Sequence, residues 1–97
     1  MIEKPKPYRS EAWLRAVASL PCVLCWREGM TQAAHRNQGK GMGTKTDDCF
    51  TAALCAPCHA EIDQGKTMTR QERRERMDLA ILETLRLLAV RGLVRAK

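Results

Sequence analysis

Two pairs of cysteines with the same internal spacing constrain this chain more than any other feature of its sequence. The segments CVLC and CAPC hold Cys22 with Cys25 and Cys55 with Cys58, and 29 residues lie between the two pairs. Zinc takes four ligands in a tetrahedron, and two sulfurs at this spacing span one edge of it without strain. A redox dithiol would need only one such pair. The sequence therefore predicts a structural zinc held by four thiolates.

The size of the chain gives a reason for such a clasp. Its 97 residues form one domain at most, and only four of them are aromatic. A chain this short buries a modest fraction of its surface, so a bound metal is a useful supplement to the core. We therefore expect a single domain over residues 1–97 whose folding depends on the metal.

The cysteine count indicates the compartment. There are five cysteines, so Cys49 has no partner in the two pairs, and we expect it to be a packed free thiol on a strand. The amino-terminal segment MIEKPKPYRSEAW is charged and proline-containing, unlike a secretory signal, and we expect no membrane-spanning segment. These features favour reduced thiols in a cytoplasm over a disulfide framework.

The charge of the chain suggests a partner without fixing it. Lys and Arg number 17 against 11 Asp and Glu, which gives a formal net charge of +6. Most of these cations are arginines, whose planar fork suits phosphate groups. A basic domain of this size often meets nucleic acid, but solubility alone would explain the charge equally well.

The first two thirds of the chain predict a small α+β core. We expect a flexible arm over residues 1–9 and a helix capped by Ser10. Residues 30–37 and 49–54 each fit one short strand, and three of the six glycines lie in the loop between them. A further helix should begin near Pro57, which suits a first helical turn.

The last third predicts a long amphipathic helix over residues 69–92. Thr69 and Glu72 form a capping-box pattern at its start, and Gly92 fits its end. Four apolar residues fall three or four positions apart and so share a face, which we expect to cover the core: Met77, Ile81, Leu85 and Leu88.

Both histidines of the chain belong to the region of the clasp. His35 lies between the two cysteine pairs, and His59 directly follows Cys58. On a helix, His59 and Asp63 stand one turn apart on the same face, so both could reach one cation. We expect the two imidazoles to face a shared cavity. The alternative is structural, with His59 bonded to a thiolate and Asp63 a helix-end charge.

Four motifs together resemble the HNH endonucleases, also called ββα-metal or His-Me finger nucleases. They are the first Cys-x-x-C pair after Pro21, AAHR, the glycine-rich GKGMGTK and LCAPCHAEID, which together cover about residues 10–65. The similarity is greatest to small phage and prophage nucleases, including the Ref-like branch. It implies a zinc-stapled core of two-stranded hairpin plus helix, flanked by an N-terminal helix and a C-terminal amphipathic helix.

The resemblance also implies an activity and roles for residues. In such nucleases a histidine at the end of the first strand activates water, and His35 occupies that position. His59 and Asp63 match ligands of a single catalytic cation, Mg²⁺ or another divalent ion. The chain would then be a DNA endonuclease, encoded by a phage or prophage in a bacterial cell, with a second copy of itself or a recombination protein as a candidate partner.

Two departures from the family pattern leave roles open. Many family members carry a ligand just before the base, where this chain has Ala34, and the central Asn is absent. Asp48 could replace either group, as a ligand or as a brace for His35, and Asp47 is an alternative. His35 could itself ligate the metal.

Several basic residues are candidates for nucleic-acid contact, although a solvated helix face would explain the last three as well. They are Arg36, Lys40, Lys45, Arg70, Arg73 and Arg74. No residues suggest base-specific recognition, so we expect DNA binding directed by structure, on branched or single-stranded DNA.

Two other functions compete with the nuclease. One is a zinc-stapled nucleic-acid-binding module whose catalytic site is degenerate at Ala34. The other is an interaction domain in which the last helix pairs with a partner or with a second copy of the chain.

Overall fold

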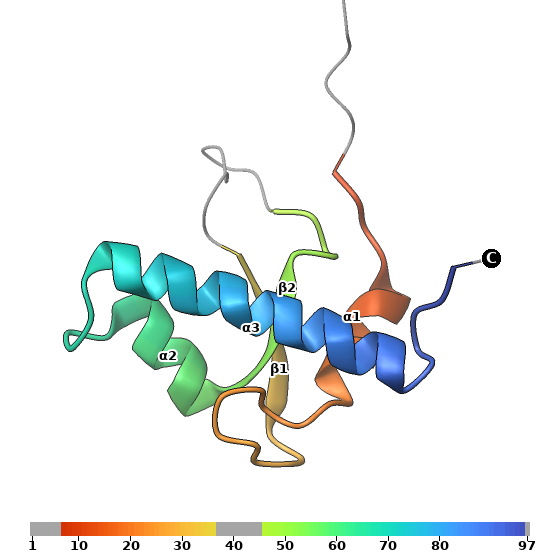
Figure 1. Ribbon diagram of the computed structural model, residues 1–97, viewed down its shortest axis with the longest axis horizontal. Coiled ribbons are helices and arrows are strands. Elements are labelled where there is room, and N and C mark those ends of the chain that lie inside the picture. The colour runs from red at the N-terminus through yellow and green to blue at the C-terminus, as the bar shows by residue number, and fades with distance from the viewer. Residues whose placement is uncertain (1–6, 37–45, 97) are drawn as a thin grey trace, which may run out of the picture.

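A two-stranded hairpin carries the fold, and three helices surround it (Figure 1). The computed structural model describes residues 7–36 and 46–96. Its elements are, in chain order, α1 (Glu11–Ala18), β1 (Thr31–His35), β2 (Thr51–Cys55), α2 (Ala56–Gln64) and α3 (Arg70–Val90). The expected α+β class and the expected order of elements are confirmed. No helix in the described part of the chain is long and apolar enough to cross a bilayer.

The two ends of the hairpin carry different candidate site residues. β1 and β2 are antiparallel, with Thr31 opposite Cys55 and His35 opposite Thr51. All five residues of β2 are buried. In Figure 1, α3 crosses the hairpin, and it packs against β2, while α1 packs against both strands. The clasp cysteine thus lies at one end of the hairpin and His35 at the other.

The first helix and the segment before it follow local rules. Ser10 caps α1 by accepting a hydrogen bond from the Trp13 N–H, as its position predicts. Val17 and Leu20 enter the core. Residues 1–6 of the expected arm lie outside the described residues, but Tyr8 is tied down, because its carbonyl accepts the Asp48 N–H at 2.9 Å.

The strand boundaries differ from the expectation at Cys49. That residue lies in a turn before β2, closed by the Phe50 N–H donating to the Asp47 carbonyl, so its assignment to a strand is wrong. Cys49 is a partly buried free thiol, as expected.

The ends of α2 and α3 depend on two glycines in different ways. Gly92, at φ 71°, terminates α3, because only glycine adopts this left-handed conformation without strain. Gly65 ends α2 with ordinary dihedrals, but a Cβ there would lie 2.1 Å from the Glu61 carbonyl oxygen. The predicted capping box of Thr69 and Glu72 is present in both halves.

The predicted face of α3 is confirmed except at Leu85, since Met77 and Leu88 are buried and Ile81 packs against the core. Leu85 is 45% exposed, and the buried residues are Met77, Ala80, Thr84 and Leu88. Thr84 replaces Leu85 at the hairpin because the backbone of β2 needs a polar partner there. Its hydroxyl accepts the Ala53 N–H at 2.9 Å and donates to the Ala80 carbonyl at 2.7 Å. Leu79, Leu82 and Val90 also remain exposed.

Replacement of Thr84 by valine should destabilise the protein, because the buried Ala53 N–H would lose its partner. We expect the free energy of unfolding to fall by about 1–3 kcal/mol, measured by urea denaturation. The exposed Thr67→Val variant is the control and should change it by less than about 0.5 kcal/mol. Equal stability of the two variants would contradict this account of the α3 face.

Candidate functional site

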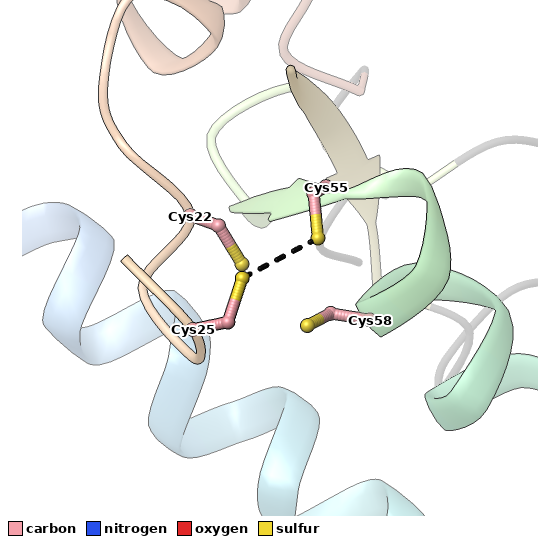
Figure 2. Close-up of side chains that lie close together, drawn as sticks. All are labelled: Cys22, Cys25, Cys55 and Cys58. Atoms are coloured by element: carbon pink, nitrogen blue, oxygen red, sulfur yellow. Dashed lines mark hydrogen bonds between the residues drawn. The ribbon is translucent and has the colours of Figure 1, made fainter. Parts of the chain in front are cut away.

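Four cysteines from three segments converge on one point. Cys22 and Cys25 lie in the turn after α1, Cys55 ends β2 and Cys58 lies in the first turn of α2. Their Sγ atoms all lie within 4.8 Å of one another, and Figure 2 shows the four side chains pointing inward. The Sγ atoms of Cys25 and Cys55 are 3.6 Å apart. These four cysteines are placed to bind a metal ion, as the spacing predicts.

The turn that carries the first pair is closed by its own backbone. The Trp26 N–H donates to the Cys22 carbonyl at 2.7 Å, and the Cys22 N–H donates to the Arg27 carbonyl. Trp26 adopts φ 63°, a left-handed conformation that bulky residues rarely take. The Val23 N–H then joins the turn to β2 at the Ala53 carbonyl. This backbone fixes both sulfurs of the first pair on the side of the second pair.

The thiols favour a bound cation electrostatically. Burial opposes ionisation of Cys22, but the N–H groups of Cys25, Cys55 and Leu24 lower its pKa to about 6. Burial raises the pKa of Cys58, and the other three sulfurs raise it further. One thiolate is therefore accommodated, whereas four thiolates this close need a cation among them.

The donor set fits zinc in particular. Zinc binds thiolates at about 2.3 Å in a tetrahedron, whose edges are then about 3.8 Å long. The separation of the Cys25 and Cys55 sulfurs, 3.6 Å, is close to that edge, and no pair of the four exceeds 4.8 Å. Cys55 occupies the N-cap position of α2 without making a side-chain cap hydrogen bond, so its sulfur is available as a ligand.

His35 lies at the end of β1 and is held by Asp48. Its Nε2 atom is 2.9 Å from Asp48 Oδ1, and the carboxylate is buried. The Ser10 N–H donates to Asp48 Oδ2 at 2.7 Å, and Arg9 Nη1 lies 3.4 Å from Oδ1. Asp48 thus contacts His35, as the brace hypothesis expects. Asp47 is outside this contact.

The environment of Asp48 favours its charged form. Burial alone would raise its pKa, but hydrogen bonds from His35 and the Ser10 N–H, with the charges of His35 and Arg9, lower it overall. An ionised carboxylate can only accept hydrogen bonds, so His35 Nε2 is the donor. The neutral imidazole then has its lone pair on Nδ1.

His59 and Asp63 form a second pair on α2. His59 Nε2 lies 3.1 Å from Asp63 Oδ2, which agrees with their predicted position one turn apart. Gln32 Oε1 lies 3.2 Å from His59 Nδ1 and holds the ring from the other side. Sequence reasoning missed Gln32, although it shares a strand face with Ala34, the position where the family pattern has a ligand.

The two histidine pairs do not form one cluster. Gln32 and His35 are three residues apart on β1, so their side chains leave the strand on opposite faces. In the described ranges, the cysteines are the only group of three or more candidate ligands close enough to hold a metal. Ala34 is buried and contributes no ligand atom.

A pocket of about 240 Å³ lies between α2 and the start of α3, with Arg36 at its edge. Its polar lining consists of Arg36, Asp63, Arg70, Arg73 and Arg74. Four of the predicted nucleic-acid contacts thus meet in one place. Lys40 and Lys45 lie outside the described residues.

The pocket meets one of the two histidine pairs, because Asp63 lines it and contacts His59. Arg36 only follows His35 in the chain. Neither imidazole lines this pocket, so it is not the shared cavity expected from the sequence.

The purified protein should contain one zinc ion per chain, measured by elemental analysis against protein concentration. Cys55→Ala should lose the zinc and the cooperative unfolding transition, because metal binding and folding are coupled. Cys49→Ala removes a cysteine outside the clasp and should keep both. Full zinc content in Cys55→Ala would contradict the four-cysteine site.

A comparison with protein families finds one match over most of the chain. The family model described as "Protein of unknown function (DUF968)" matches residues 1–86. No curated protein and no solved structure matches the chain. These comparisons assign no activity to the site, so its function has to be inferred from the residues that form it.

Proposed function

The chain belongs to the DUF968 family, and we propose that it is a metal-dependent endonuclease that hydrolyses phosphodiester bonds in DNA. The hairpin followed directly by α2 would be the ββα core of an HNH nuclease. The observation that carries the proposal is the contact between His35 and the buried Asp48. This arrangement resembles that of a catalytic general base, because one ring nitrogen is hydrogen-bonded to the carboxylate and the other is left to accept a proton.

His35 is the general base in this proposal. Asp48 accepts the Nε2–H, so Nδ1 can take a proton from water. The hydroxide oxygen forms a bond to phosphorus, and the bond to the leaving 3′-oxygen breaks. Asp48 then stabilises the imidazolium that results, as a positioning residue.

His59 and Asp63 would hold the catalytic cation, Mg²⁺ or another divalent ion. An imidazole nitrogen and a carboxylate oxygen 3.1 Å apart are donors that such ions accept. Gln32 orients the imidazole toward this position. When bound, the cation would supply charge stabilisation for the scissile phosphate and the leaving oxygen.

The four-cysteine clasp would hold a structural zinc ion. It is closed by four sulfurs and leaves no position for water, which is typical of structural rather than catalytic zinc sites. The role of the clasp is to fix the start of α2 against β1, and hence the place of His59.

A specific observation favours a second candidate, a nucleic-acid-binding module without catalysis. Ala34 supplies no ligand, and His59 and Asp63 provide only two protein donors in the described part of the chain. His35 also leaves β1 on the face opposite Gln32, which contacts His59, so the base and the cation site are not gathered in one cavity. The arginine-lined pocket would serve this module as well as the nuclease. The two functions differ only in whether DNA is cut.

Cleavage of plasmid and single-stranded DNA with Mg²⁺ or Mn²⁺ separates the candidates. We expect metal-dependent cleavage that His35→Ala slows about 10²- to 10⁴-fold, because it removes the base. Asp48→Asn should slow it roughly 10- to 100-fold through loss of the hydrogen-bond partner. Asp47→Asn is the matched control and should retain wild-type activity.

Zinc content and thermal unfolding must be the same in all three variants, so that a loss of activity reports on chemistry. DNA binding without cleavage under either metal would favour the binding module. Equal cleavage by wild type and His35→Ala would remove His35 from the mechanism.

A further inference from the structure

The arginine pocket carries more positive charge than contact with a strand backbone requires. Four guanidinium groups line it together with the carboxylate of Asp63. Asp78 holds Arg36 with two hydrogen bonds, from Nε at 2.7 Å and Nη2 at 3.2 Å. Asp63 and Asp78 offset two of the four positive charges, and an excess of two remains.

One guanidinium in the pocket is incompletely satisfied by protein. Arg73 Nη1 donates to the Asp63 carbonyl at 2.9 Å, which fixes the group against α2. The Arg73 Nε atom is buried and, among the described residues, has no hydrogen-bond partner. Because Nε is buried, a molecule in the pocket would have to accept hydrogen bonds from the terminal Nη groups of Arg73.

The position of these arginines on α3 points to the same kind of ligand. Arg70, Arg73 and Arg74 all lie in the first turns of a 21-residue helix, at the positive end of its dipole. Cations are unfavourable there and anions are favourable. A bound phosphate would offset both the dipole and the mutual repulsion of the arginines.

We propose that this pocket binds the terminal phosphate of a nucleic-acid strand. This inference rests on the proposed function, because it names the part of the DNA substrate that the arginines hold. A terminal phosphate monoester carries a charge of about −1.5 to −2 at neutral pH and has three acceptor oxygens. A phosphodiester inside the strand carries a single charge and would leave half of the excess uncompensated.

The size of the pocket agrees with this ligand. Its volume of about 240 Å³ is below the roughly 300 to 1,000 Å³ typical of sites for drug-sized molecules. It suits a phosphate with part of its sugar, not a whole base and sugar. Buried Ile62 and Met77 form its apolar walls.

Because Asp63 lines the pocket and contacts His59, a strand end held here would place the adjoining nucleotides near the proposed cation site. The enzyme would then act close to strand ends, nicks or flaps in preference to continuous duplex.

The test is binding of short single-stranded DNA without added divalent cation, followed by fluorescence anisotropy. Three oligonucleotides of one sequence carry a 5′-phosphate, a 3′-phosphate or no terminal phosphate. We expect one phosphorylated form to bind at least about tenfold more tightly than the unphosphorylated form, as a charged hydrogen-bonding group warrants. Whether the tighter binder carries the 5′- or the 3′-phosphate shows which end of the strand the pocket holds.

Two variants locate the preference. The double variant Arg70→Ala and Arg74→Ala, whose side chains are exposed, should lose it, and Arg73→Lys should reduce it because lysine lacks the planar fork. Arg86→Ala removes an exposed arginine of α3 outside the pocket and should keep it. Zinc content checks that each variant is folded.

Equal affinity of wild type for all three oligonucleotides would overturn the proposal in favour of internal phosphate contacts. A preference that survives in the double variant would also overturn it. The result is independent of cleavage. If the protein cuts no DNA but still prefers an oligonucleotide with a terminal phosphate, the nuclease proposal fails and the terminal-phosphate proposal stands.

Discussion

The convergence of four sulfurs is the contact on which the rest of the structure depends. It joins the turn after α1, the end of β2 and the start of α2. Cys55 is both the last residue of a strand and the N-cap of a helix, so the clasp sets the angle at which α2 leaves the hairpin. His59 follows the last clasp cysteine, and its position is therefore fixed by the same contact.

A second, polar anchor acts at the opposite end of the hairpin. Buried Asp48 gathers His35, Arg9 and the backbone of Ser10 around one carboxylate. Thr46 extends this anchor, since its hydroxyl donates to the Arg36 carbonyl and its own carbonyl accepts from Arg9. The two anchors thus place one histidine each, and the arginine pocket lies beside Arg36 and Asp63 between them.

The sequence predicts those features that follow from local rules. Ligand spacing identifies the clasp, helical periodicity pairs His59 with Asp63, and a capping box marks the start of α3. Features that depend on contacts far apart in the chain escape it. The sequence around Asp48 does not predict that Arg9 and Ser10, almost forty residues earlier in the chain, contact its carboxylate. Apolar spacing on α3 is wrong only at Leu85, because the Ala53 N–H of β2 requires the hydroxyl of Thr84 on the buried face.

The most direct measurement is X-ray absorption at the zinc edge of the purified protein. If all four cysteines bind the metal and leave both histidines for other chemistry, the first shell contains four sulfurs at about 2.3 Å and no nitrogen. A shell of three sulfurs with an imidazole nitrogen at about 2.0 Å would contradict the account. His59 would then belong to the clasp, and the proposed cation site on α2 would be lost with it.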